Sequence, residues 1–125
     1  SGADYQRAQF QRTELFRRVQ GWFETADYLV TPTLSRTALP IDQDLFEPIR
    51  IDGVEVGELR RNWFPYTMPF NITGHPALTL CCGYDSEGLP IGLQIVGRFR
   101  DDASVLRAAA LYENSEDWLS RWPDL

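Results

Sequence analysis

The sequence predicts a small α/β fold, in which a mixed sheet of three to five strands packs against an N-terminal and a C-terminal helix. Three observations predict it: a helical pattern of apolar residues near the N-terminus, two apolar runs of strand length further along, and a second helical pattern near the C-terminus. With 125 residues the chain fits one domain that can bury a small core.

The first predicted helix covers residues 4–24. Apolar residues recur there every three or four positions, with arginine, glutamine and glutamate between them. This spacing is typical of an amphipathic helix with one buried stripe, here Tyr5, Ala8, Leu15, Phe16, Val19, Trp22 and Phe23. Residues 28–31 then predict a short strand that stops at Pro32, because proline has no N–H to donate to a neighbouring strand.

A loop and a β-hairpin are expected next. Residues 34–47 show no clear period and are expected to form the loop. The pair Asp52-Gly53 lies between the alternating apolar segments 49–51 and 54–56. An Asp-Gly pair in that setting is the strongest short-range signal for a hairpin.

A short helix and two strands are predicted after the hairpin. Residues 58–66 are expected to form the helix, closed by Pro65 or by Pro69. Residues 77–82 and 91–96 are continuous apolar runs, joined by a polar loop with glycine at both ends. Such runs are typical of neighbouring strands that are buried on both faces of a sheet.

The last predicted helix begins after Asp101 or Asp102, either of which can cap it. Its expected inner stripe is Val105, Ala108, Ala109 and Tyr112. A hydrophobic patch of Trp118, Leu119 and Trp122 follows it.

Charge and hydropathy exclude some partners. The net charge of −6 repels phosphate backbones, so nucleic acid is not expected as a partner. No apolar run approaches the roughly 20 residues that a membrane span requires, and no membrane contact is expected. Nothing at the N-terminus has the pattern of a signal peptide. We therefore expect a cytoplasmic protein.

The two cysteines, Cys81 and Cys82, are adjacent within an apolar run. Because neighbouring cysteines bridge each other only with strain, we expect buried, reduced thiols. Together with the single histidine, His75, they are too few to hold zinc. No metal and no cofactor are expected.

No catalytic residue is expected in this chain. All twelve basic residues are arginine, so no lysine base or Schiff base is present. The serines lie in predicted loops or on an exposed helix, and His75 precedes a proline in a turn, where packing beside the sheet is the ordinary role. Strand-interior thiols are usually inert, so Cys81 and Cys82 are weak candidates for a nucleophile. The pairs Asp42/Asp44 and Asp101/Asp102 are expected to be loop ends or helix caps.

Two motifs at fixed spacing resemble the C-terminal end of the amidase signature family. They are N-x-T-G-x-P-A at residues 71–77 and G-L-P-I-G-L-Q-I-V-G at residues 88–97, and D-Y-L-V-T-P-T at residues 27–33 is similar to an upstream strand of that family. The residues that carry the resemblance, expected to be structural, are Thr31, Pro32, Thr33, Asn71, Thr73, Gly74, Pro76, Gly88, Pro90, Gly92, Gln94 and Gly97.

The resemblance implies a partial domain. Members of the family hydrolyse or transfer the nitrogen of carboxamides with two serines and a lysine, in a region N-terminal to the part that this chain resembles. The chain is therefore expected to be the last quarter of an amidase, a single partial domain over residues 1–125 that is inactive alone, with Ser1-Gly2 a cloning remnant. Its expected partners are the N-terminal catalytic part of the same protein and, in the intact enzyme, a small carboxamide substrate.

The resemblance also implies candidates for a substrate-pocket wall, namely Phe64, Thr67, Met68 and Asn71. The A subunit of tRNA-dependent amidotransferases, a related alternative, carries an acidic residue where Phe64 stands, so an apolar or aryl amide is the favoured substrate. A short non-enzymatic interaction module of the same fold is the other alternative.

Two further expectations concern packing. Gln94 is the one long polar residue within the second apolar run, so its amide should be buried and bonded to the backbone or to a neighbouring loop. An excerpt of a sheet leaves open edges, from which we expect a homodimer or a higher oligomer.

Overall fold

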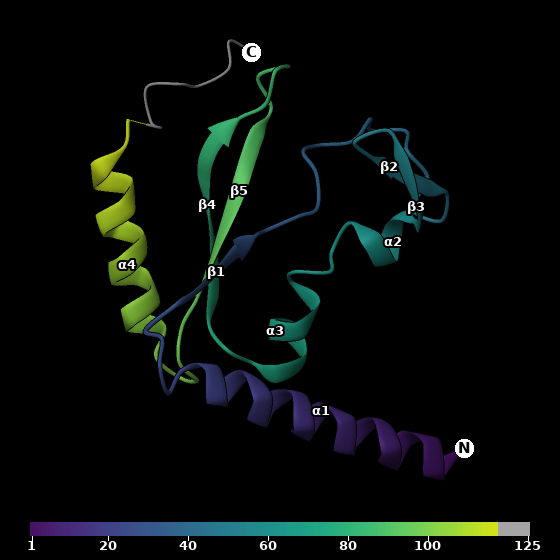
Figure 1. Ribbon diagram of the computed structural model, residues 1–125, viewed down its shortest axis with the longest axis vertical. Coiled ribbons are helices and arrows are strands. Elements are labelled where there is room, and N and C mark those ends of the chain that lie inside the picture. Colours follow the sequence, from purple (N-terminus) through teal and green to yellow (C-terminus); the bar gives the residue numbers. More distant parts are fainter. Residues whose placement is uncertain (118–125) are drawn as a thin grey trace.

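The structure, a computed structural model, describes residues 1–117 and confirms the α/β class with a helix at each end (Figure 1). The predicted patch at Trp118, Leu119 and Trp122 lies outside the described residues. The elements, in chain order, are α1 (Gly2–Trp22), β1 (Leu29–Pro32), β2 (Pro48–Ile51), β3 (Val54–Glu58), α2 (Leu59–Asn62), α3 (Met68–Thr73), β4 (Ala77–Tyr84), β5 (Pro90–Val96) and α4 (Asp102–Ser115). No helix in this part of the chain is long and apolar enough to cross a membrane.

The main sheet has three strands in the order β1-β5-β4. Both pairings are antiparallel, and so is that of β2 with β3, so the mixed pairing that we expected does not occur within residues 1–117. The reason for β4 and β5 is their short connecting loop, which can join only antiparallel neighbours. Their register shifts between Cys81 and Gly83, where β4 carries one extra residue.

The second sheet is the predicted hairpin of β2 and β3. Asp52 and Gly53 have φ angles of 50° and 77°, the left-handed conformation that a two-residue hairpin turn requires at both central positions. The hairpin and α2 stand apart from the main sheet (Figure 1).

Helix α3 was not anticipated by the sequence pattern. The expected helix over residues 58–66 is only the single turn α2, and a second short helix begins at Met68. Pro69 lies in the first turn of α3, where its missing N–H costs no hydrogen bond, so it starts this helix and does not close the earlier one. Gly74 ends α3 in the left-handed conformation, with a φ of 74°.

The core consists of two small clusters on opposite sides of β5. One joins α1, α3 and β5 through Val19, Phe23, Phe70 and Val96. The other joins β4, β5 and α4 through Leu80, Ile95 and Ala109. The adjacent residues Ile95 and Val96 belong to different clusters because successive strand side chains point to opposite faces.

The predicted burial holds only in part. Val19 is the one buried residue of α1, and Tyr5 in its first half is 64% exposed, because this end of α1 extends beyond the sheet (Figure 1). Thr79 in β4 is exposed and Ile91 in β5 is 38% exposed, so these two strands are not covered on both faces within the described residues. Val30 in β1 is 57% exposed. At α4, Asp101 is the cap, since its carboxylate accepts the N–H of Ser104.

Candidate functional site

Gln94 connects the main sheet to the segment that precedes α3. Its side chain is 4% exposed, and its Nε2 donates to Oγ1 of Thr31 and to the carbonyl oxygen of Tyr66, both at 2.9 Å. This geometry confirms the expected burial and bonding of the amide. The bond to Tyr66 also ties residues 63–67 to the main sheet. Residues of this segment line two hollows.

The first hollow, which we call the Phe64 groove, has a volume of about 720 Å³. Two of the four predicted pocket residues, Phe64 and Met68, line it. Its other lining residues are Phe46, Glu58, Arg60, Arg61 and Pro65. The groove thus combines an apolar wall with charged side chains from the end of β3 and from α2.

The other two predicted pocket residues lie outside this groove. Thr67 is the N-cap residue of α3, and its hydroxyl donates to the carbonyl oxygen of Phe64 at 3.2 Å. Asn71 is exposed on α3 and does not line the Phe64 groove. The structure therefore brings together Phe64 and Met68 but not the full set.

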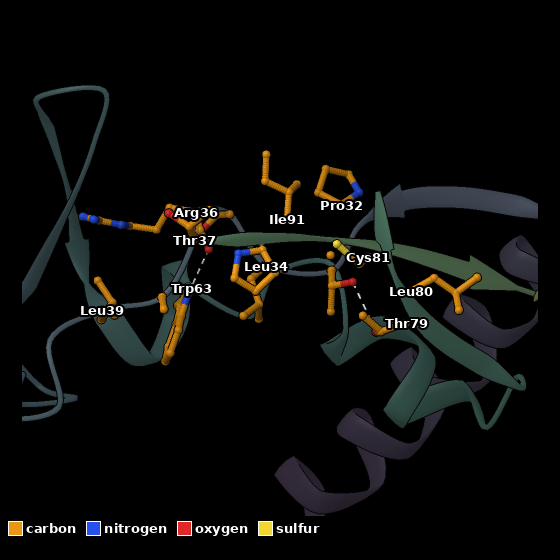
Figure 2. A pocket seen from close by; sticks show the side chains of 15 residues that line it. Pro32, Leu34, Arg36, Thr37, Leu39, Trp63, Thr79, Leu80, Cys81 and Ile91 are labelled. Carbon is orange, nitrogen blue, oxygen red and sulfur yellow. Dashed lines mark hydrogen bonds between the residues drawn. The ribbon is translucent and has the colours of Figure 1, made fainter. Parts of the chain in front are cut away.

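The second hollow, which we call the Trp63 cleft, has a volume of about 670 Å³ and lies between residues 32–39, Trp63, the middle of β4 and the start of β5 (Figure 2). Its lining consists of Pro32, Thr33, Leu34, Ser35, Arg36, Thr37, Ala38, Leu39, Trp63, Thr79, Leu80, Cys81, Pro90, Ile91 and Gly92. Sequence reasoning missed this cleft because residues 34–47 show no period, although Pro32, Thr33, Pro90 and Gly92 are motif residues.

The floor of the Trp63 cleft is packed tightly around Gly92. A Cβ atom at this position would lie 2.8 Å from Oγ1 of Thr33 and 3.2 Å from Cγ2 of Thr79. The two threonine hydroxyls meet above the strand at 3.2 Å. Gly97 is equally confined, since a Cβ atom there would collide with Cγ2 of Val105. These two motif glycines are therefore required by close packing.

His75 is a buried residue that packs among aromatic rings. Its ring is 5% exposed and contacts the rings of Phe16, Phe23 and Phe99. Nδ1 hydrogen-bonds to Oγ1 of Thr73 at 2.9 Å, and Nε2 is buried without a partner among the described residues. Burial lowers the pKa of His75, which favours the neutral ring.

The two cysteines are free thiols and are half-buried, not fully buried as expected. Cys81 is partly open because it lines the Trp63 cleft. Their sulfur atoms donate to backbone oxygens, Cys81 to Gly83 and Cys82 to Ile91. No serine or cysteine in residues 1–117 bonds to the His75 ring, whose one side-chain partner is Thr73.

Comparison with known proteins agrees with the motifs in the β1, α3–β4 and β5 segments. The profile of the Amidase family matches residues 1–106. The chain belongs to this family. It spans about a quarter of the length of the curated relatives that it matches: 23% of the A subunit of the glutamyl-tRNA(Gln) amidotransferase from Chloroflexus aggregans, to which it is 40% identical, and 25% of the acylamidase of Rhodococcus erythropolis, to which it is 35% identical. Both matches cover 98% of this amidase-family chain.

Solved structures also match this chain over about a quarter of their own length. A crystal structure of an amidase superposes with a TM-score of 0.83 over 94% of this chain and 26% of its own, at 26% identity. The structure of 6-aminohexanoate cyclic dimer hydrolase superposes with a TM-score of 0.80 over 99% of this chain and 26% of its own, at 28% identity. The fold described above is therefore a portion of the amidase fold.

Proposed function

We propose that the chain is the C-terminal part of a carboxamide C–N hydrolase, in which it forms scaffold and one wall of the substrate pocket. The observation that carries this proposal is the Phe64 groove, because it gathers Phe64 and Met68 from the segment that leads into the family motif. The chain contains no lysine, so a serine–serine–lysine site would be supplied by the remainder of the amidase fold.

The groove also supports a substrate class. Phe46, Phe64 and Met68 give it an apolar wall, which suits an aryl or alkyl group of an amide. The similarity to the acylamidase of Rhodococcus erythropolis points to the same class of substrate. Glu58, Arg60 and Arg61 lie at the same groove, where they can hold a polar end of the substrate.

A chimera tests the proposal. This chain would replace the matching 25% of the Rhodococcus erythropolis acylamidase, and hydrolysis of a panel of aryl and alkyl amides would be measured. We expect turnover by the chimera and none by the isolated chain. Turnover by the isolated chain would contradict the proposal and direct attention to His75, Cys81 and Cys82.

A second candidate is a fragment of an amidotransferase A subunit. The 40% identity to the protein from Chloroflexus aggregans favours it. The apolar Phe64 argues against recognition of glutamine, since that side chain has no carboxylate to pair with an amino group. Release of ammonia from glutamine by the same chimera, at a rate above that for aryl amides, would favour the second candidate.

A further inference from the structure

We propose that the Trp63 cleft is the binding site, called the seat below, for an apolar segment from the part of the amidase fold that this chain lacks. The inference rests on the proposed function, in which this chain completes a larger enzyme, but it concerns a surface separate from the Phe64 groove. Of the residues that line the two hollows, none is shared.

Hydrogen bonds hold the loop of residues 33–36 in place and so form the cleft. The N–H of Thr33 donates to the carbonyl oxygen of Gly92 at 2.8 Å, and the N–H of Ser35 donates to that of Trp63 at 3.2 Å. In return, Nε1 of Trp63 donates to the carbonyl oxygen of Arg36 at 3.4 Å (Figure 2). Residues 33–36 are thus hydrogen-bonded both to β5 and to Trp63, so the cleft has its shape before any other segment binds.

The chemistry of the lining identifies the kind of occupant. Most lining side chains are apolar, and Arg36 is the one charged residue among them. Its guanidinium already donates to the carbonyl oxygen of Arg50 at 3.0 Å. The hydroxyls of Thr33 and Thr79 bond to each other. Since the two threonine hydroxyls bond to each other and most of the lining is apolar, the cleft suits an apolar chain segment.

The share of the fold outside this chain indicates where that segment comes from. The chain superposes on solved amidases with TM-scores of 0.80 and 0.83 yet covers only 26% of each of them. Three quarters of such a fold therefore lies elsewhere. A cleft with a mostly apolar lining is typical of a surface that another part of a protein or a ligand covers.

Cys81 provides a direct probe, because its thiol lies at the wall of the cleft (Figure 2). Reaction with N-phenylmaleimide would be followed by mass spectrometry in the isolated chain and in the acylamidase chimera. Both would carry Cys82→Ser, and Cys81→Ser would serve as the matched control. We expect Cys81 to react at least about tenfold more slowly in the chimera, because the seated segment must open before the reagent enters.

Three outcomes would overturn the proposal. Equal rates in both proteins would mean that the cleft stays open in the complete fold. Protection that rises with the concentration of the isolated chain would mean that a second copy covers it. Protection of the chimera that requires an added aryl amide would mean that the cleft holds a small molecule. A chimera that protects Cys81 but has no amidase activity would support the seat and contradict the proposed function.

A second variant avoids dependence on thiol chemistry. Ala38 lines the cleft and is exposed in this chain, as is Ser86 in the β4–β5 loop, which does not line it. Ala38→Glu and Ser86→Glu should both leave the thermal midpoint of the isolated chain nearly unchanged. In the chimera, Ala38→Glu should lower the midpoint by several degrees and Ser86→Glu should not, because only the first places a carboxylate in the covered cleft. Equal effects in the chimera would contradict the seat.

Discussion

Gln94 and Thr31 face each other across the β1–β5 register, and Nε2 of Gln94 lies 2.9 Å from Oγ1 of Thr31. The same nitrogen donates to the carbonyl oxygen of Tyr66, so one amide joins two strands and the segment before α3. This joint holds the Phe64 groove and the Trp63 cleft in place.

Replacement of Gln94 by leucine should destabilise the chain. Gln94→Leu removes both donors and leaves two oxygens without their partner, so we expect a loss of about 2 to 3 kcal/mol in the free energy of unfolding. Urea unfolding measures it. Thr31→Val is the matched control, which removes one acceptor and should cost about 1 kcal/mol. Equal losses in the two variants would contradict a joint centred on Gln94.

Replacement of Gly97 by alanine should also destabilise the chain, because the new methyl group would collide with Cγ2 of Val105. We expect Gly97→Ala to cost about 1 to 3 kcal/mol by overpacking. Val105→Ala makes room for the methyl group, so the double variant should lose less than the two single losses added together. Additive losses, measured by thermal unfolding, would show that the collision is not the cause.

The stability of the chain should depend on the protonation of His75. Burial lowers its pKa in the folded state, whereas the unfolded chain binds a proton near the ordinary value of about 6.5. The contribution of neutral His75 is therefore complete above about pH 6.5 and is lost as the pH falls through the folded-state pKa. Urea unfolding at several pH values between neutral and mildly acidic should show this decline.

His75→Phe is the control for this pH dependence. The variant keeps an aromatic ring among Phe16, Phe23 and Phe99 but cannot bind a proton. His75 is the single histidine of the chain. The pKa of Asp85 lies in a more acidic range, because hydrogen bonds from Thr37 and from backbone amides lower it. A decline that persists in His75→Phe would assign the effect to another group.

Phe64 should determine the substrate preference of the acylamidase chimera. Phe64→Asp removes part of the apolar wall, so kcat/KM for aryl amides should fall about tenfold or more relative to that for amides that carry an amino group. Phe64→Leu keeps the wall apolar and should preserve the preference. An unchanged ratio in Phe64→Asp would place the groove outside the substrate pocket.

The strands and the hairpin could be predicted because their signals are local. The apolar runs became β4 and β5, and Asp52-Gly53 formed the turn between β2 and β3. The α/β class and the helix at each end followed from the same patterns. Burial was harder to predict, since the stripe expected over residues 4–24 is buried only at Val19 and Phe23. A stripe shows that a face is apolar, not which part of the fold covers it.

The site could be predicted only in part, for two physical reasons. Pro69 has the pattern of a helix stop when it is in fact in the first turn of α3, and the helical turn then separates Asn71 from the groove of Phe64. The Trp63 cleft depends on backbone hydrogen bonds of residues 33–36, which leave no pattern in side-chain identity. Contacts of this kind form only when distant segments fold together.

The position of β5 between the two core clusters has a consequence for how the chain opens. Ile95 and Val96 anchor this strand to opposite sides, so neither α1 nor α4 can expose β5 by leaving alone. Its amide hydrogens should therefore exchange with deuterium only when the whole chain unfolds, whereas the hairpin of β2 and β3, which stands apart from both clusters, should exchange through local opening. The strand that should exchange most slowly carries one of the family motifs, so this motif lies in the most stable part of the chain.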